Sequence, residues 1–123
     1  MDRNPVGWFE IYVQDMERAK AFYGAVFETQ FQQLETSELQ MWSFPAFANS
    51  NGSTGALVCM KGFPSGGNST IVYFMCEDCA NEEKRASENG GKVFKHKFSI
   101  GEHGFISLVT DPDGNMIGLH SMQ

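Results

Sequence analysis

The residues of this sequence that could carry chemistry are few and scattered. Cys76 and Cys79 have the Cys-x-x-Cys spacing of zinc ligands and redox pairs. A structural zinc ion needs two further ligands, and only Cys59 and dispersed histidines remain. Thioredoxin-like redox pairs occur at a helix N-terminus in another fold context, and only Cys79 falls in a predicted first helical turn. We therefore interpret Cys76 as a buried, unreactive thiol and regard a redox role as the less favoured alternative.

Glu10 is a more informative candidate. Residues 7–14 are rich in aromatic and β-branched types, which predicts a strand. Alternation along a strand places Trp8, Glu10 and Tyr12 on one face. A carboxylate between aromatic rings can accept a proton or attract a cationic group. The sequence holds no Gly-x-Gly-x-x-Gly or Walker pattern for binding phosphate.

Composition limits the class of protein. A chain of 123 residues, 41% hydrophobic and 20% charged, is typical of one globular domain. The net charge of −6 and the absence of a basic stripe argue against nucleic-acid binding. The apolar stretches are too short to span a bilayer, and the N-terminal residues do not resemble a signal peptide. With an odd, low cysteine count, these features predict a cytoplasmic protein.

The elements that must position these residues follow from periodicity. Asp15 suits a helix N-cap after the first strand. The apolar residues that follow it have helical spacing, i, i+3, i+4, i+7 and i+8. They are Ala19, Phe22, Tyr23, Val26 and Phe27. Three strands are predicted after the helix, at about residues 29–35, 39–45 and 56–60.

The same order recurs after a linker at residues 61–69. A strand at 70–76 precedes Asp78, a second N-cap candidate, and a polar helix at 79–89. Further strands are predicted at about 92–98, 104–110 and 115–121. The N-cap aspartates and the turn glycines Gly52 and Gly114 are offset by nearly the same interval, which indicates an internal duplication. We predict one α+β domain over residues 1–123, with two βαβββ halves at about 5–61 and 69–121.

Two longer motifs are similar to a known family. Gly7 to Asp15, followed by Arg18-Ala19-Lys20-Ala21-Phe22-Tyr23, resembles the opening strand and helix of vicinal-oxygen-chelate proteins, the glyoxalase/bleomycin-resistance/dioxygenase superfamily. Thr110 to Asn115 resembles the turn before their last strand. The resemblance implies tandem βαβββ modules that form a curved mixed sheet around a central cleft, and it implies a homodimer. The family includes lyases, isomerases, dioxygenases and drug-sequestering proteins, so function must be argued from the site.

The resemblance also implies where a metal would bind. Metal-dependent members place ligands at positions that correspond to Trp8, Ala56, Ile71 and Gly118. None of these side chains offers a suitable lone pair. We therefore predict no metal and no other cofactor. A displaced site is the alternative, in which Glu10 and His120 hold a metal or act as an acid/base pair if their strands adjoin.

The predicted cleft lining favours ligand binding over catalysis. Its residues are mainly aromatic and thioether side chains with one carboxylate, which suit an aromatic or cationic small molecule. The predicted lining comprises Trp8, Glu10, Tyr12, Met41, Ile71, Tyr73, Met75, Ser107, Met116 and His120. We predict a metal-independent small-molecule-binding protein. The alternatives are a lyase, isomerase or dioxygenase that uses Glu10 and His120 as catalytic residues, and an interaction module whose cleft is filled by its own side chains.

Overall fold

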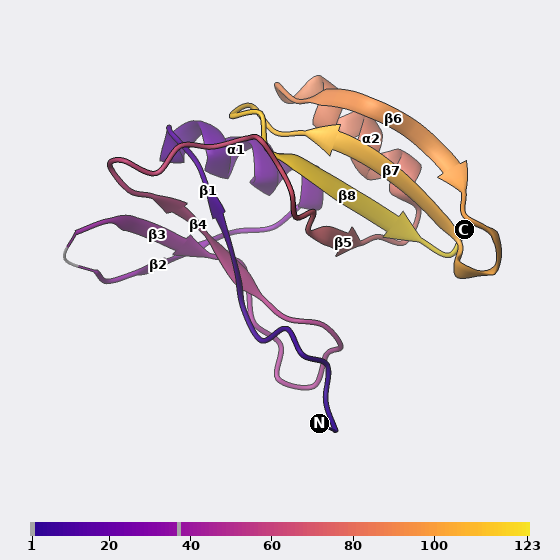
Figure 1. Ribbon diagram of the computed structural model, residues 1–123, viewed down its shortest axis with the longest axis horizontal. Coiled ribbons are helices and arrows are strands. Elements are labelled where there is room, and N and C mark those ends of the chain that lie inside the picture. Colours follow the sequence, from indigo (N-terminus) through magenta and orange to yellow (C-terminus); the bar gives the residue numbers. More distant parts are fainter. Residues whose placement is uncertain (1, 37) are drawn as a thin grey trace.

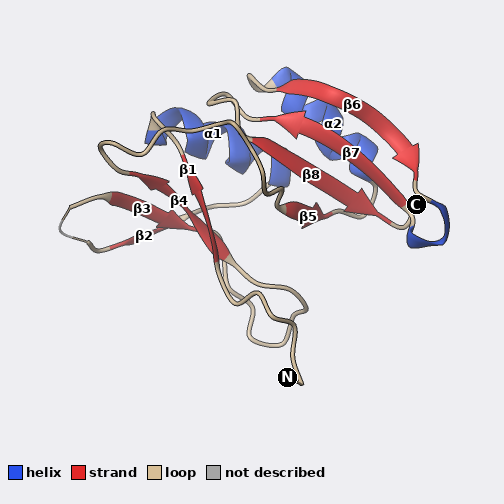
Figure 2. Ribbon diagram, in the orientation of Figure 1, coloured by secondary structure: helices blue, strands red, loops and turns tan. Residues whose placement is uncertain are grey.

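The computed structural model describes residues 2–36 and 38–123. Each half contributes one four-stranded sheet and one helix, and both helices lie on the same side of the sheets (Figures 1 and 2). The α+β class and the order strand, helix, three strands in each half are confirmed. The eight strands found in the described residues form two separate sheets, with strand orders β1-β4-β3-β2 and β5-β8-β7-β6.

The first half begins with a strand whose alternation is as predicted. Ile11 of this strand is buried against the helix, whereas Glu10 is exposed on the open face. β1 pairs with β4 in parallel, and β3 joins β4 to β2 by antiparallel pairs. The elements are β1 (Phe9–Tyr12), α1 (Met16–Phe27), β2 (Gln32–Leu34), β3 (Gln40–Ser43) and β4 (Gly55–Cys59).

The second half repeats this pairing. β5 pairs with β8 in parallel, and β7 joins β8 to β6 by antiparallel pairs. A short 3-10 turn at Gly101–His103 separates β6 from β7. The elements are β5 (Tyr73–Met75), α2 (Cys79–Glu88), β6 (Lys92–Ser99), β7 (Phe105–Thr110) and β8 (Met116–Ser121).

Both helices start at the predicted aspartates. The Asp15 carboxylate accepts a hydrogen bond from the Arg18 amide at 3.1 Å, and that of Asp78 accepts one from the Ala80 amide at 3.0 Å. These bonds satisfy amides that a helix N-terminus otherwise leaves without partners. The two helices pack against each other and share one core with the inner faces of both sheets. No helix among residues 2–36 and 38–123 is long and apolar enough to cross a membrane.

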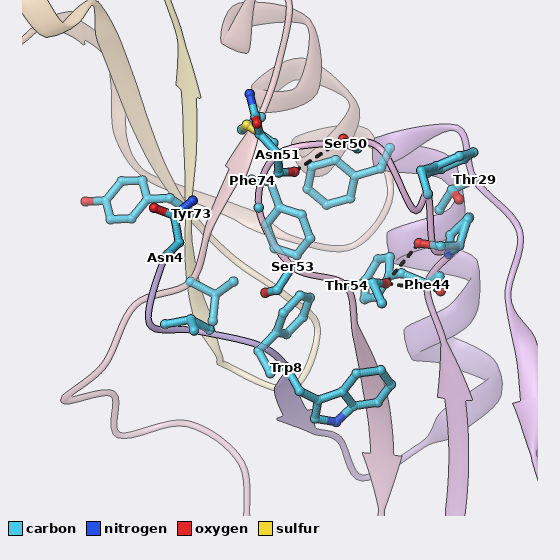
Figure 3. A pocket seen from close by; sticks show the side chains of 18 of the residues that line it. Asn4, Trp8, Thr29, Phe44, Ser50, Asn51, Ser53, Thr54, Tyr73 and Phe74 are labelled. Atoms are coloured by element: carbon cyan, nitrogen blue, oxygen red, sulfur yellow. Dashed lines mark hydrogen bonds between the residues drawn. The ribbon is translucent and has the colours of Figure 1, made fainter. Parts of the chain in front are cut away.

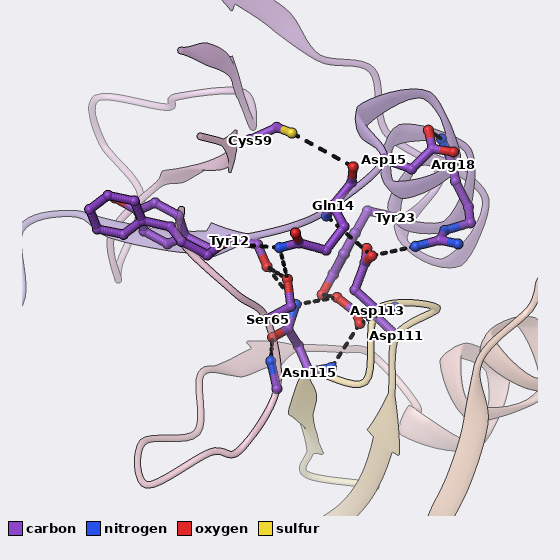
Figure 4. A network of polar contacts seen from close by, with 12 residues as sticks. Tyr12, Gln14, Asp15, Arg18, Tyr23, Cys59, Ser65, Asp111, Asp113 and Asn115 are labelled. Atoms are coloured by element: carbon purple, nitrogen blue, oxygen red, sulfur yellow. Dashed lines mark hydrogen bonds and ion pairs between the residues drawn. The ribbon is translucent and has the colours of Figure 1, made fainter. Parts of the chain in front are cut away.

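A polar network joins the halves at one end of the seam between them (Figure 4). The buried Tyr23 hydroxyl of α1 donates to Asp111 of the turn before β8 at 2.8 Å. Asp113 of the same turn accepts from the Gln14 amide at 3.1 Å and pairs with Arg18. Burial raises the pKa of Asp111, although the donors around its carboxylate oppose this shift. The predicted Asp-Pro-Asp-Gly turn therefore holds one half against the other.

Candidate functional site

A cavity of about 860 Å³ opens between the two halves of the protein, at strands β1 and β5 (Figure 3). The residues before β1, the loop from β3 to β4 and the residues around β5 contribute its walls. Its size falls within the range of small-molecule sites. The loop adds hydroxyl and amide groups from Ser50, Asn51, Ser53 and Thr54 to a surface that is mainly apolar.

Phe74 and three other phenylalanines form part of the aromatic wall of the cavity. Phe74 of β5 stacks on Phe27 of α1, with ring centroids 4.3 Å apart. It also meets Phe9 edge-on at 5.9 Å and lies 5.6 Å from Phe44. Offset and edge-to-face rings contribute stability beyond their buried area. Because Phe74 comes from one half and its three partners from the other, the cavity wall is also part of the interface between the halves.

Exposed apolar side chains gather around this cavity. Trp8 is 42% exposed, Tyr73 47%, Met75 69% and Phe47 74%, and all four line the cavity. Exposed large apolar side chains grouped around a cavity are typical of binding surfaces. In Figure 3, Trp8 and Tyr73 lie on different walls, with Phe74 and Ser53 between them.

The structure brings only part of the predicted lining into this cavity. Trp8, Ile71, Tyr73 and Met75 line it. Glu10 lies beside it, because its carboxylate accepts hydrogen bonds from the Trp8 indole at 3.2 Å and from the Tyr12 hydroxyl at 2.9 Å. The Tyr12 bond, with burial, raises the pKa of that phenol. Glu10 thus holds the Trp8 ring in place from outside the cavity.

Glu10 and His120 do not form the pair that the displaced-site hypothesis requires. Glu10 is on β1 of the first sheet and His120 is on β8 of the second, and these strands do not pair. The imidazole Nε2 of His120 instead lies 2.6 Å from the backbone oxygen of His103. The displaced-site hypothesis required the strands of Glu10 and His120 to adjoin. Within one chain they do not, because β1 and β8 belong to different sheets.

Three other predicted residues lie on open sheet faces outside the cavity. Tyr12 stacks on Phe63 with centroids 5.4 Å apart. Met41 stands opposite Val58 on β4, which places it on the same face as Tyr12. Met116 is opposite Thr110 at the start of β8. The prediction that both open faces line one cleft therefore fails for these residues, because the cavity lies at the edges of the sheets.

Ser107 lies on the opposite face from the one expected. It stands opposite Leu119, whose side chain belongs to the core under the helices, so Ser107 also faces α2. Its side chain is fully buried, and its hydroxyl donates to Glu83 at 2.8 Å. A residue buried beneath a helix cannot contact a ligand in the cavity. The prediction that Ser107 lines the binding site is therefore wrong, and its role is structural.

Glu83 gives the stability of the protein a pH dependence. Burial raises its pKa, but hydrogen bonds from His96, Ser107 and the Lys97 amide outweigh burial, so the pKa of Glu83 is lowered. Because the folded-state pKa lies below the unfolded-state pKa of about 4.3, the ionised Glu83 carboxylate stabilises the folded state at pH values above about 4.3. This stabilisation is lost as the pH falls through the folded-state pKa. We expect Glu83→Gln to reduce the free energy of unfolding by about 1–2 kcal/mol near neutral pH.

Urea unfolding of wild type and Glu83→Gln, repeated from about pH 7 to about pH 3, checks this expectation. The difference between the two proteins should shrink as the pH falls below the unfolded-state value. Glu102→Gln is the matched control, because the Glu102 side chain is 90% exposed. A difference for Glu83→Gln that stays constant with pH would contradict the role given to its carboxylate.

The cysteines are free thiols in the structure. Cys79 is fully buried at the start of α2, where its amide binds the Ser121 hydroxyl at 3.0 Å. Burial, together with the negative charge of Glu82, raises the pKa of Cys76 to about 12. Cys76 is only partly buried, so that part of its interpretation from the sequence is corrected, but the raised pKa keeps its thiol protonated and unreactive at neutral pH, as predicted.

The four positions at which the resemblance implied metal ligands carry no ligand groups. Gly118 stands opposite Tyr73, and a side chain at 118 would overlap the Tyr73 ring. In residues 2–36 and 38–123, no three His, Cys, Asp or Glu side chains lie close enough together to hold a metal ion.

Several cavity residues were not predicted from the sequence. Phe9 and Phe27 were placed on core faces by periodicity, and they do pack against the core but also line the cavity. The loop residues had no period from which to infer their direction. Glu82 carried a usable signal, since it lies between Cys79 and Ala86 of α2 at core-facing helical spacing, where an apolar residue is expected.

The family is shown by sequence. The profile of the Glyoxalase/Bleomycin resistance protein/Dioxygenase superfamily matches residues 6–119. The chain belongs to this superfamily. No curated protein sequence is significantly similar to the chain.

Several solved structures have the same fold as this chain. TnmS3, an antibiotic binding protein from Streptomyces sp. CB03234, is 24% identical, with 98% of each chain covered and a TM-score of 0.71. Hypothetical protein SA1046 from S. aureus is 16% identical, with 96% of this chain and 94% of the other covered and a TM-score of 0.73. Glyoxalase I from Zea mays is 17% identical with a TM-score of 0.74, and the chain spans 46% of its length. At these identities the likeness establishes the fold.

Proposed function

We propose that this superfamily member binds an aromatic small molecule in the cavity between its halves, without a metal ion. The observation that carries the proposal is the cavity itself, which is walled by phenylalanines and surrounded by exposed Trp8, Tyr73 and Met75. Rings and thioethers give large contact area to flat apolar molecules. The alternative of an interaction module with a filled cleft is less favoured, because the cavity is open.

Two further observations support binding over catalysis. TnmS3, which is described as an antibiotic binding protein, matches this chain over nearly its full length. The enzymatic alternative needs Glu10 and His120 together, and they lie in separate sheets. The homodimer and the cytoplasmic location stay predictions.

Titration with 2-naphthol, a flat aromatic probe, tests the proposal. We expect saturable changes in the amide NMR shifts of the loop before β4 and of β5, with β6 unchanged. A ligand that binds only the folded state should also raise the melting temperature by mass action. Treatment with a chelator should leave both effects intact, because no metal takes part. Absence of saturable shifts at the cavity would contradict the proposed function, and loss of binding after chelation would contradict its metal independence.

A further inference from the structure

Among the described residues that line the cavity, Glu82 is the acidic one, and it projects from the first turn of α2. Its side chain is only 14% exposed. One carboxylate oxygen, Oε2, lies 3.2 Å from the guanidinium of Arg85. Arg85 is itself held by a 2.8 Å hydrogen bond to the backbone oxygen of Val26. The carboxylate is therefore fixed on one side by an anchored cation.

The other oxygen, Oε1, has no hydrogen-bond partner and almost no contact with solvent. The nearby Cys76 thiol, whose pKa is raised by burial and by the charge and hydrogen bonding of Glu82, is a weak donor that also lies 3.5 Å from the Phe74 carbonyl. A buried acceptor without a donor costs free energy, and such groups are uncommon in folded proteins. In a ligand site, an unpaired polar group of this kind can hydrogen-bond a ligand and select for its chemistry.

We propose that Glu82 determines the specificity of the cavity by accepting a hydrogen bond from a hydroxyl or N–H group on an aromatic ligand. This inference rests on the proposed function and adds the chemical class of the ligand. Because Arg85 already balances much of the Glu82 charge, a neutral donor is sufficient and a cationic group is not required. Because Oε1 is shielded from solvent, the carboxylate must turn toward the cavity to meet the donor.

The sequence placed the single carboxylate of the site at Glu10. Both oxygens of Glu10 already have donors, from Trp8 and Tyr12, whereas Oε1 of Glu82 has none. The two acidic residues therefore differ in role. Glu10 positions the Trp8 wall, and Glu82 contacts the ligand.

Two matched probes test the proposal. They are 2-naphthol, which carries a donor, and 2-methoxynaphthalene, which has similar shape and no donor. In wild type we expect 2-naphthol to bind about tenfold more tightly, as one charge-assisted hydrogen bond allows. In Glu82→Ala the dissociation constants of the two probes should become nearly equal. Glu88→Ala, which removes an exposed carboxylate from the same helix, should keep the wild-type ratio.

Glu82→Gln keeps the side-chain shape and serves if the alanine variant does not fold. It should reduce the ratio to a few-fold, since an amide oxygen is a weaker acceptor than a carboxylate. Equal binding of both probes to wild type, or a ratio that survives both substitutions, would overturn the role of Glu82 while leaving the proposed function standing. Failure of both probes to shift the cavity amides would instead contradict the proposed function as well as this inference.

Discussion

Phe22→Ala should lower the free energy of unfolding by about 3–5 kcal/mol, the range measured for truncating a large buried aromatic residue. The Phe22 side chain is 1% exposed and meets Tyr23 edge-on at 5.0 Å. Its ring also lies close to Gly91, just after α2, so it packs on both halves. Removing it leaves a cavity where the halves share their core, and neighbouring side chains can fill that space only in part.

Denaturant unfolding of Phe22→Ala and of the control Phe94→Ala measures this effect. Phe94 is 66% exposed on β6, so its truncation should change stability by less than about 1 kcal/mol. A loss below about 1 kcal/mol for Phe22→Ala would contradict the packing described for α1.

Trp8→Ala should weaken the binding of 2-naphthol by roughly tenfold or more while leaving the protein folded, because tryptophans in binding sites often contribute about 2 kcal/mol or more. Trp8 lines the cavity, and its indole is oriented by the Glu10 carboxylate. With 42% of the residue exposed, its truncation removes little core packing. The Trp8→Ala variant should therefore lose affinity for 2-naphthol while its stability changes little.

The amide NMR titration gives the dissociation constant, and a thermal melt of the same sample reports the fold. Phe94→Ala again serves as the control, since it removes an exposed ring that does not line the cavity. Unchanged affinity in Trp8→Ala would exclude Trp8 from the binding site. Loss of the cooperative thermal unfolding transition would show that Trp8 has a structural role that its exposed fraction does not indicate.

The fold was predictable because each helix and strand carries its own period. Asp15 and Asp78 mark both helix starts, and the stripe from Ala19 to Phe27 identifies the side of α1 that packs on the sheets. The recurrence of the same order indicated two equivalent halves. What periodicity could not supply was how the halves meet, because that depends on contacts such as the bond from Tyr23 to Asp111.

The site residues were predictable only where the alternation of side chains along a single strand was enough to fix the face on which a residue lies. Trp8, Tyr73 and Met75 follow from alternation and from the repeat. Ser107 was misplaced because the phase of β7 is set by its pairing with β8, which the sequence of β7 alone does not reveal. Phe74 of the edge strand β5 became a cavity residue by approaching Phe44 of the other half, a long-range contact with no local pattern.

The fit of the Tyr73 ring over Gly118 makes the cavity adjustable from a position that does not line it. Any side chain at 118 must push the ring aside, so a single change on β8 would reshape the site without altering a cavity-lining residue. Related proteins could thus come to accept different molecules by drift at a strand position just behind the cavity wall, with the rest of the binding surface retained.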